Sequence, residues 1–171
     1  MNLEKKFSLI FGDWVPGVLH TKDYDTFFKN IRCHLKDDGL FIGRECLRPT
    51  RQPVDLEKVV KKHYQSYAKK YSFYQTSMHY VYGYKPNAKT AMWNIKAARQ
   101  AVDQVNQKGL LAKKDYDFMV KALAIEKEAS ASMMVQADFD RAVSRYFKII
   151  TKHHVKEPSS AWYPIYVLKK K

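Results

Sequence analysis

Apolar residues near the start of the chain form a short continuous run that predicts a buried strand. Residues 7–11 read FSLIF, and the run ends at Gly12 and Asp13. An apolar run without polar alternation is typical of a parallel strand covered on both faces, and such strands carry side chains to the ligand-binding edge of an α/β sheet. The pattern therefore predicts a central strand with a carboxylate at its C-terminal end.

The next segment has the spacing of an amphipathic helix followed by a second strand. Its apolar positions recur every three or four residues, at Tyr24, Phe27, Phe28, Ile31 and Leu35. Thr21 is the expected N-cap, and Gly39 is expected to close the helix in a left-handed turn. Residues 40–43 then form a short buried strand. Strand, helix and strand in this order predict a right-handed βαβ unit.

The pattern changes to helices and loops over residues 53–146. Helical spacing is found in VDLEKVVKKHYQSYAKKY, TAMWNIKAARQAVDQVNQ, DYDFMVKALAIEKEA and ADFDRAVSRYF. Two final strands are expected in FKIITKHHV and YPIYVLKK, which are rich in β-branched and aromatic residues. We therefore expect one α/β domain, 1–171, with about four strands in a mixed sheet, the last strand antiparallel, and a helical insertion at 53–146 between the second and third strands.

Composition and charge narrow the class of protein. With 46% hydrophobic residues the chain is expected to fold, and no apolar run approaches the roughly 20 residues that span a bilayer. No signal-peptide pattern opens it, so a cytoplasmic protein without a membrane partner is expected. His and Cys show no metal-ligand spacing, so no metal is expected. The net charge of +14 fits either a polyanion partner or a basic solvated surface.

The order of these segments resembles the C-terminal half of a class I S-adenosylmethionine-dependent methyltransferase. The residues that carry the resemblance are FSLIFGDWV, FFKNIRCHLKDDGLFIGRECLRP and YFKIITKHHV…WYPIYVLKKK. In that family the fourth strand ends in a short acidic motif, a helix and a glycine turn lead to the fifth strand, and the last two strands close the sheet as an antiparallel hairpin. The helical segment between them resembles the family's substrate-capping insertion.

The resemblance also implies that part of the fold is missing from this sequence. The family binds its cofactor with a glycine-rich loop after the first strand and an acid after the second, and here no two of the six glycines make a G-x-G. The remaining strands could form a four-stranded sheet whose first strand is an unpaired apolar edge. The chain is then a fragment or truncated form, a split enzyme completed by another chain, or a degenerate remnant.

The resemblance suggests candidate site residues, each with a simpler structural alternative. The cofactor candidates are Gly12, Asp13 and Trp14, although Asp13 can instead cap the following turn and Trp14 can pack beneath a helix. The candidates for binding the methyl acceptor are Arg44, Arg48, Tyr80 and Trp93, although the arginines can form surface ion pairs. Methyl transfer depends mainly on positioning and desolvation, so no catalytic residue is assigned.

Two functions from different classes follow. The first is a truncated or split methyltransferase-like protein whose parent activity uses S-adenosylmethionine on a small molecule, with poor cofactor binding by this chain alone. It implies a complementing N-terminal half, or another protein partner, at the exposed strand edge. The second is a non-catalytic basic module that binds a nucleic acid or a protein. The tyrosine-rich run SFYQTSMHYVYGYKP fits either a cap over a small-molecule pocket or a stacking surface for bases.

Overall fold

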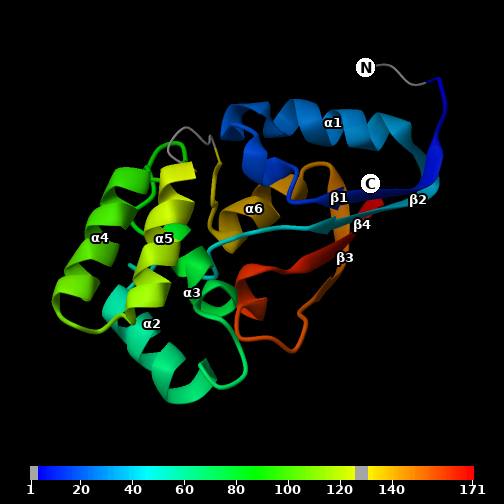
Figure 1. The fold of residues 1–171 in the computed structure, drawn as a ribbon. Helices are drawn as coiled ribbons and strands as arrows, with labels where there is room; N and C mark the ends of the chain where they lie inside the picture. The colour runs from blue at the N-terminus through cyan, green and yellow to red at the C-terminus, as the bar shows by residue number, and fades with distance from the viewer. Residues whose placement is uncertain (1–3, 126–130) are drawn as a thin grey trace. The chain divides into compact units, whose positions relative to one another are not determined.

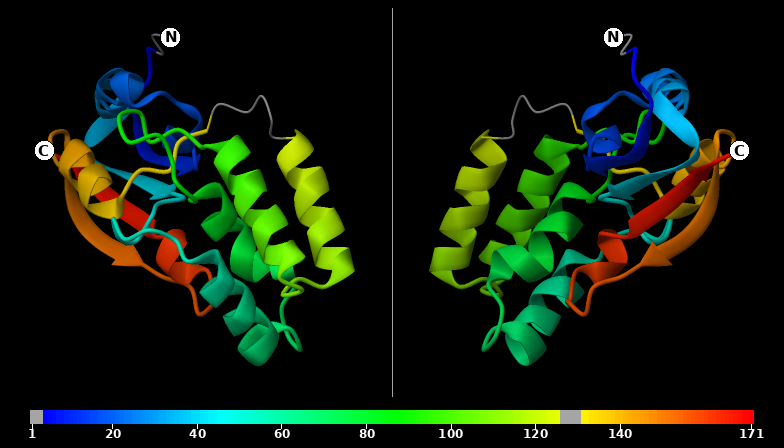
Figure 2. Two further views of the ribbon diagram at one scale, coloured as in Figure 1. Left: turned by 90° about the vertical axis from the view of Figure 1, so that its left-hand side faces the viewer. Right: turned by 90° about the vertical axis from the view of Figure 1, so that its right-hand side faces the viewer.

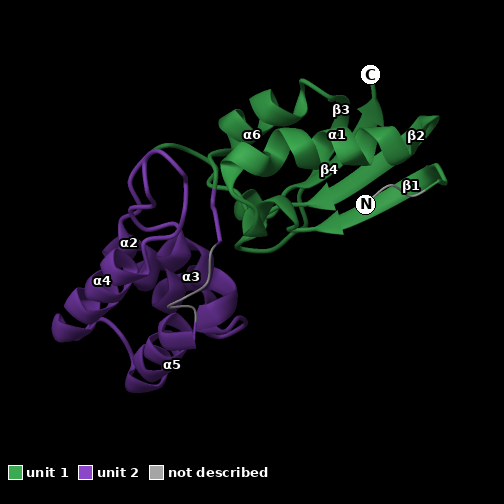
Figure 3. Ribbon diagram, turned by 90° about the horizontal axis from the view of Figure 1, so that it is seen from above, with its two compact units in different colours: residues 1–51, 134–171 green, residues 52–133 purple. Residues whose placement is uncertain are grey.

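The computed structural model describes residues 4–125 and 131–171. It divides into two compact units, drawn in different colours in Figure 3. Residues 1–51 and 134–171 form the first, which we call the sheet unit, and residues 52–133 form the second, the helical unit.

The sheet unit contains a four-stranded mixed sheet (Figure 1). Its strands are β1 (Phe7–Asp13), β2 (Leu35–Arg44), β3 (Phe147–His153) and β4 (Ile165–Lys170). The strand order is β1-β2-β4-β3, with β1 parallel to β2 and β4 antiparallel to both of its neighbours. The predicted fold class, an open mixed α/β sheet with an antiparallel last strand, is therefore confirmed.

Two helices, α1 (Tyr24–His34) and α6 (Gln136–Val143), supply the other half of the sheet unit's core. The core is rich in aromatic residues, because alternate residues of the strands turn large side chains toward these helices. Phe28 of α1 is fully buried, and its ring lies 6.0 Å from that of Phe139 on α6, edge to face. Phe41, Phe147 and Tyr166 complete the cluster from three strands.

The connection from α1 to β2 differs from the prediction. Phe7 pairs with Leu35 and Leu9 with Leu40, so residues 36–39 bulge out opposite the single residue Ser8. Gly39 does not take a left-handed conformation, and the predicted glycine turn is wrong. A glycine is needed there for another reason: a Cβ would lie 3.0 Å from two backbone oxygens, those of Lys36 and Phe7.

The start of α1 also differs from the prediction. A short 3-10 turn, Thr21–Asp23, precedes the helix, and the N-cap position belongs to Asp23. Thr21 is therefore not the N-cap. The helix covers the predicted apolar stripe from Tyr24 to Ile31, but it ends at His34, and Leu35, the last predicted position of the stripe, is the first residue of β2.

β1 lies at the edge of the sheet, and the prediction that it is buried on both faces is wrong. Phe7, Leu9 and Phe11 are 40%, 42% and 70% exposed. Among the described residues no strand pairs with the outer side of β1. The other expectation, an unpaired apolar edge strand, is confirmed.

The helical unit has a core of its own. Its helices are α2 (Leu56–Lys62), α3 (Phe73–Tyr82), α4 (Ile95–Gln107) and α5 (Lys113–Ile125), with a π-helical turn at His63–Tyr67 directly after α2. Figure 2 shows α4 and α5 side by side. The packing of the four helices buries an aliphatic cluster that includes Val60, Met78, Val81, Val102, Met119 and Leu123.

Local signals account for the boundaries of these helices. The predicted helix over residues 90–107 begins only at Ile95, because the Asn94 side chain accepts a hydrogen bond from the backbone of Ala97. Ser72 and Gln75 form a capping box that starts α3. Residues 126–129, predicted to extend α5, lie outside the described residues. The helical unit ends at residue 133, before the expected 146, because α6 packs on the sheet.

Candidate functional site

The C-terminal ends of β1 and β2 carry a charged pair. Asp13 and Arg44 are opposite each other in the parallel register, and both carboxylate oxygens accept hydrogen bonds from the guanidinium, each at 2.8 Å. This pairing raises the pKa of Arg44. Both side chains are more than half exposed, and we call this pair the polar rim. It lies at the C-terminal ends of parallel strands, which is the edge where α/β sheets generally bind ligands.

The other two cofactor candidates, Trp14 and Gly12, pack against neighbouring residues. The indole of Trp14 folds over Gly17, where a Cβ would lie only 1.7 Å from its Nε1. Trp14 itself has a positive φ of 52°, an uncommon conformation for a bulky residue. Gly12 lies against the ring of Phe41, which a Cβ would approach to 3.0 Å. The alternative that Asp13 caps the following turn is wrong, since the N-cap position belongs to Val15.

Glu45, directly after β2, is a buried carboxyl group behind this rim. Side chains alternate along the strand, so Phe41, Gly43 and Glu45 share the face that the helices cover. Glu45 is 1% exposed, and its Oε1 has no hydrogen-bond partner among the described residues. A Cβ on Gly43 would lie 2.9 Å from that oxygen, so glycine provides the space for the carboxyl group.

The surroundings of Glu45 favour its neutral form. Burial raises the pKa of Glu45 well above its ordinary value, and the negative charge of Asp13 raises it further. Burial likewise raises the pKa of the neighbouring Cys46 to about 12, against a smaller opposing effect of a hydrogen bond with Tyr163. At neutral pH Cys46 is therefore a thiol and not a nucleophile. The pair thus offers a neutral acid and an unreactive thiol.

Arg48 joins the strand region to α6. Its backbone N–H donates to the carbonyl of Met134 and its carbonyl accepts from Gln136, each at 2.9 Å. Burial, and secondarily the charge of Arg51, lowers the pKa of Arg48. Arg51 forms an ion pair with Asp138 at 2.5 Å. The backbone of Arg48 therefore has a structural role, and its guanidinium donates to the carbonyl of Arg51 at 3.5 Å.

Tyr80 and Trp93 belong to the helical unit, whereas the other five candidates belong to the sheet unit. Trp93 stacks on Tyr82, with ring centroids 4.1 Å apart and planes 4° apart. Tyr80 is half-buried on α3 with its ring beside that of His79. Burial lowers the pKa of His79 to about 3, so this imidazole is neutral. The joint role of Tyr80 and Trp93 in binding the methyl acceptor stays a prediction.

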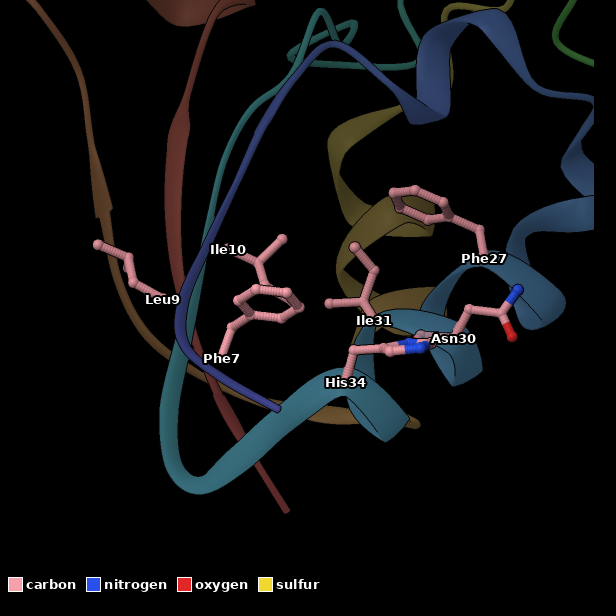
Figure 4. A pocket seen from close by; sticks show the side chains of 7 residues that line it. All are labelled: Phe7, Leu9, Ile10, Phe27, Asn30, Ile31 and His34. Atoms are coloured by element: carbon pink, nitrogen blue, oxygen red, sulfur yellow. The ribbon is translucent and has the colours of Figure 1, made fainter. Parts of the chain in front are cut away.

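A cavity of about 450 Å³ lies between β1 and α1. Figure 4 shows Phe7 and Ile10 of the strand facing Phe27 and Ile31 of the helix, whereas Leu9 points to the other side of the strand. Asn30 and His34 add polar groups to a lining that is otherwise apolar. The edge strand β1 therefore lines a cavity, in addition to having an unpaired side among the described residues.

The roles that the sequence suggested for Asp13 and Arg44 stay predictions, and neither the burial of Glu45 nor the cavity was predicted. The alternation along β2 was the available signal for Glu45, because a residue in register with Phe41 and Gly43 must face the helices. The cavity had no local signal, because its two walls come from different elements.

In the described ranges, no group of three or more His, Cys, Asp or Glu could hold a metal ion. Searching the same ranges for helices long and apolar enough to cross a membrane finds none.

Comparison with known proteins gives little support for an assignment. No family model matches the chain, and no curated protein matches it. One solved structure that matches, described as "The structure of PKMT2 from Rickettsia typhi", has a TM-score of 0.47 and 8% sequence identity. The match covers 99% of this chain and 36% of that chain, so this chain spans about a third of its length. A similarity at this level assigns neither family nor activity.

Proposed function

We propose that this chain is the substrate-side half of a class I S-adenosylmethionine-dependent methyltransferase fold. One observation carries the proposal: the strand order β1-β2-β4-β3, with a parallel β1–α1–β2 unit and β4 inserted antiparallel between β2 and β3. The family's fourth, fifth, seventh and sixth strands have this order and these directions. Four strands admit many other orders, so agreement with the order expected from the resemblance supports the proposal.

The unpaired side of β1 supports this strand as the place where the other half would join. β1 exposes Phe11 and Leu9 and has an unpaired side among the described residues. Apolar edges of this kind pair with another strand or aggregate. A complementing N-terminal half that adds a parallel strand to β1 would cover this edge, and the protein would then be a split or truncated enzyme.

We infer that this chain by itself binds S-adenosylmethionine poorly, because the candidate residues are engaged with one another or with neighbouring residues. Arg44 already binds both oxygens of Asp13, and the ring of Phe41 covers Gly12. The Trp14 indole is folded onto Gly17. The cofactor therefore needs the complementing half, and in the assembled protein Arg44 and Arg48 would face an anionic small molecule as methyl acceptor.

The test compares the chain alone with its native assembly. We expect calorimetric titration of the purified chain with S-adenosylmethionine to give no binding, while the chain isolated from its own cells with its partner binds the tritiated cofactor in equilibrium dialysis. Micromolar binding by the chain alone would overturn the half-fold. A native assembly with a second chain that binds none of the cofactor would overturn the methyltransferase assignment.

A charge-matched pair of variants tests the edge. Leu9→Lys with Phe11→Lys places two charges on the exposed face of β1, and we expect it to abolish assembly with the complementing half. Ile125→Lys with Val155→Lys adds the same charge at exposed apolar positions elsewhere and should leave assembly intact. Equal loss in both variants would show that the β1 edge is not the interface.

A further inference from the structure

The helical unit carries a basic surface that the proposed methyltransferase fold does not use. No Asp or Glu occurs between Glu57 and Asp103, whereas nine Lys and Arg and seven Tyr do. The densest part begins at the end of α2 and continues through the π-helical turn. We define the lysine–tyrosine surface as Lys61, Lys62, Tyr67, Lys69, Lys70 and Tyr71.

The lysines of this surface have no acidic partners among the residues that the structure describes. None of the four ammonium groups lies within 4.0 Å of a carboxylate of the described residues, and all four side chains are exposed. Lys58, one turn earlier, pairs with Asp55, and Lys108 pairs with Glu57. The positive charge of the surface is therefore not neutralised within the part of the chain that the structure describes.

Two tyrosine rings lie among these charges. The Nζ of Lys62 is 5.7 Å from the centre of the Tyr67 ring, and the Nζ of Lys70 is 5.4 Å from that of Tyr71. The two rings are 6.4 Å apart, with their planes at 81°. Each ring is only half-buried, so an aromatic face and a cation are presented together at two adjacent places.

Contacts of His63 and Tyr64 hold the π-helical turn, and with it Tyr67, in place. His63 is buried, with its Nδ1 2.7 Å from Thr76 Oγ1, and burial lowers the pKa of His63, so its ring adds no charge at neutral pH. The Tyr64 hydroxyl donates to Asp115 at 2.7 Å and accepts from the Ala112 N–H at 2.9 Å. These contacts tie the turn to α3 and α5. Inserted π-turns occur frequently at functional sites.

We propose that the lysine–tyrosine surface binds single-stranded nucleic acid. The ammonium groups bind phosphates, and unpaired bases stack on the rings of Tyr67 and Tyr71. A duplex keeps its bases stacked inside and cannot use the rings. Residues 61–71 include no Leu, Ile, Phe or Trp to enter a membrane, and an acidic peptide would leave the rings unused.

The first test measures how salt and local charge affect binding of a fluorescent oligo-dT of about 12 nucleotides. Four phosphate contacts predict a slope of about −3 in log affinity against log salt. Lys62→Glu with Lys70→Glu should weaken binding about tenfold or more and reduce the slope by about half. Lys148→Glu with Lys156→Glu also lowers the net charge of +14 by four and should change affinity less than about twofold. Equal losses in the two variants would overturn the proposal in favour of diffuse charge.

The second test separates base stacking from simple attraction to a polyanion. Tyr67→Leu with Tyr71→Leu should weaken oligo-dT binding at least about fivefold and leave binding of heparin unchanged. Tyr67→Phe with Tyr71→Phe keeps both rings and should bind like the unmodified chain, which also controls for loss of folding. Equal effects on heparin and oligo-dT, or tighter binding to phosphatidylserine vesicles than to the oligonucleotide, would overturn the proposal.

Discussion

The two units differ in how they satisfy their polar and apolar groups. In the helical unit the buried His63 is hydrogen-bonded to Thr76, and Thr76 contacts the hydroxyl of Ser77 at 3.1 Å. In the sheet unit the buried Glu45 has an oxygen without a hydrogen-bond partner in the described part of the chain, and β1 leaves large apolar side chains exposed. The helical unit also exposes apolar side chains, such as Phe118 and Ile125, and what sets it apart is the positive charge of its lysine–tyrosine surface. The sheet unit is set apart by the unpaired edge of β1 among the described residues and by the buried carboxyl group behind the ends of β1 and β2.

The largest effects are expected from substitutions that open the core of one unit at a time. Phe28→Ala in the sheet unit and Met119→Ala in the helical unit each remove a fully buried side chain, at an expected cost of about 2–5 kcal/mol. Since each unit has its own hydrophobic cluster, Phe28→Ala should speed hydrogen exchange in α1 and β2 and spare α3 to α5. Met119→Ala should do the reverse. Loss of protection in both units together would show one cooperative core.

Removing the charge of Glu45 should stabilise the protein. Because the folded-state pKa of Glu45 is raised, ionisation favours the unfolded chain, and stability is lost as pH rises from the ordinary Glu pKa through the folded value. We expect Glu45→Gln to be about 1–3 kcal/mol more stable than the unmodified chain at high pH, with the difference shrinking toward pH 4.

Urea unfolding at several pH values measures this effect. The matched control is Glu157→Gln, an exposed carboxylate whose replacement should change stability by less than about 0.5 kcal/mol at any pH. Destabilisation by Glu45→Gln at high pH would mean that the buried carboxylate has a favourable partner in solution.

The structure was predicted correctly from the sequence where the spacing of apolar residues, or the order of the strands, decides it. The apolar stripe from Tyr24 to Ile31 is α1, and the strand order follows from segment order and a known topology. The prediction failed where a residue's role depends on something distant. Gly39 looked like a helix stop, but what requires glycine there is the close approach of two backbone oxygens, those of Lys36 and of Phe7 on β1, which the sequence pattern does not show. Glu45 follows the exposed Arg44, and only its alternation with Phe41 and Gly43 marks it as a residue that faces the helices.

The capping box of α3 allows a smaller test in the helical unit. Ser72→Ala removes the side-chain acceptor for the Gln75 N–H and should cost about 1 kcal/mol. Thr21→Ala, at the position wrongly expected to cap α1, should cost less than about 0.5 kcal/mol. Thermal unfolding of the two variants checks the order, and a larger cost at Thr21 would contradict the structure.

The smallest effect on stability is expected at the exposed rim. Asp13→Asn removes an ion pair whose members are both more than half exposed, so the direct cost should be about 0–1 kcal/mol and should fall with added salt. The same change also removes a negative charge that raises the pKa of Glu45. Ionisation of Glu45 then becomes easier, which recovers part of the cost at high pH. A double-mutant cycle separates the two effects: Asp13→Asn should cost more in the Glu45→Gln background than in the unmodified chain at high pH, and equally in both near pH 4. If Asp13→Asn costs the same in both backgrounds at high pH as well as near pH 4, Asp13 and Glu45 do not interact. The rim and the buried acid would then be independent features.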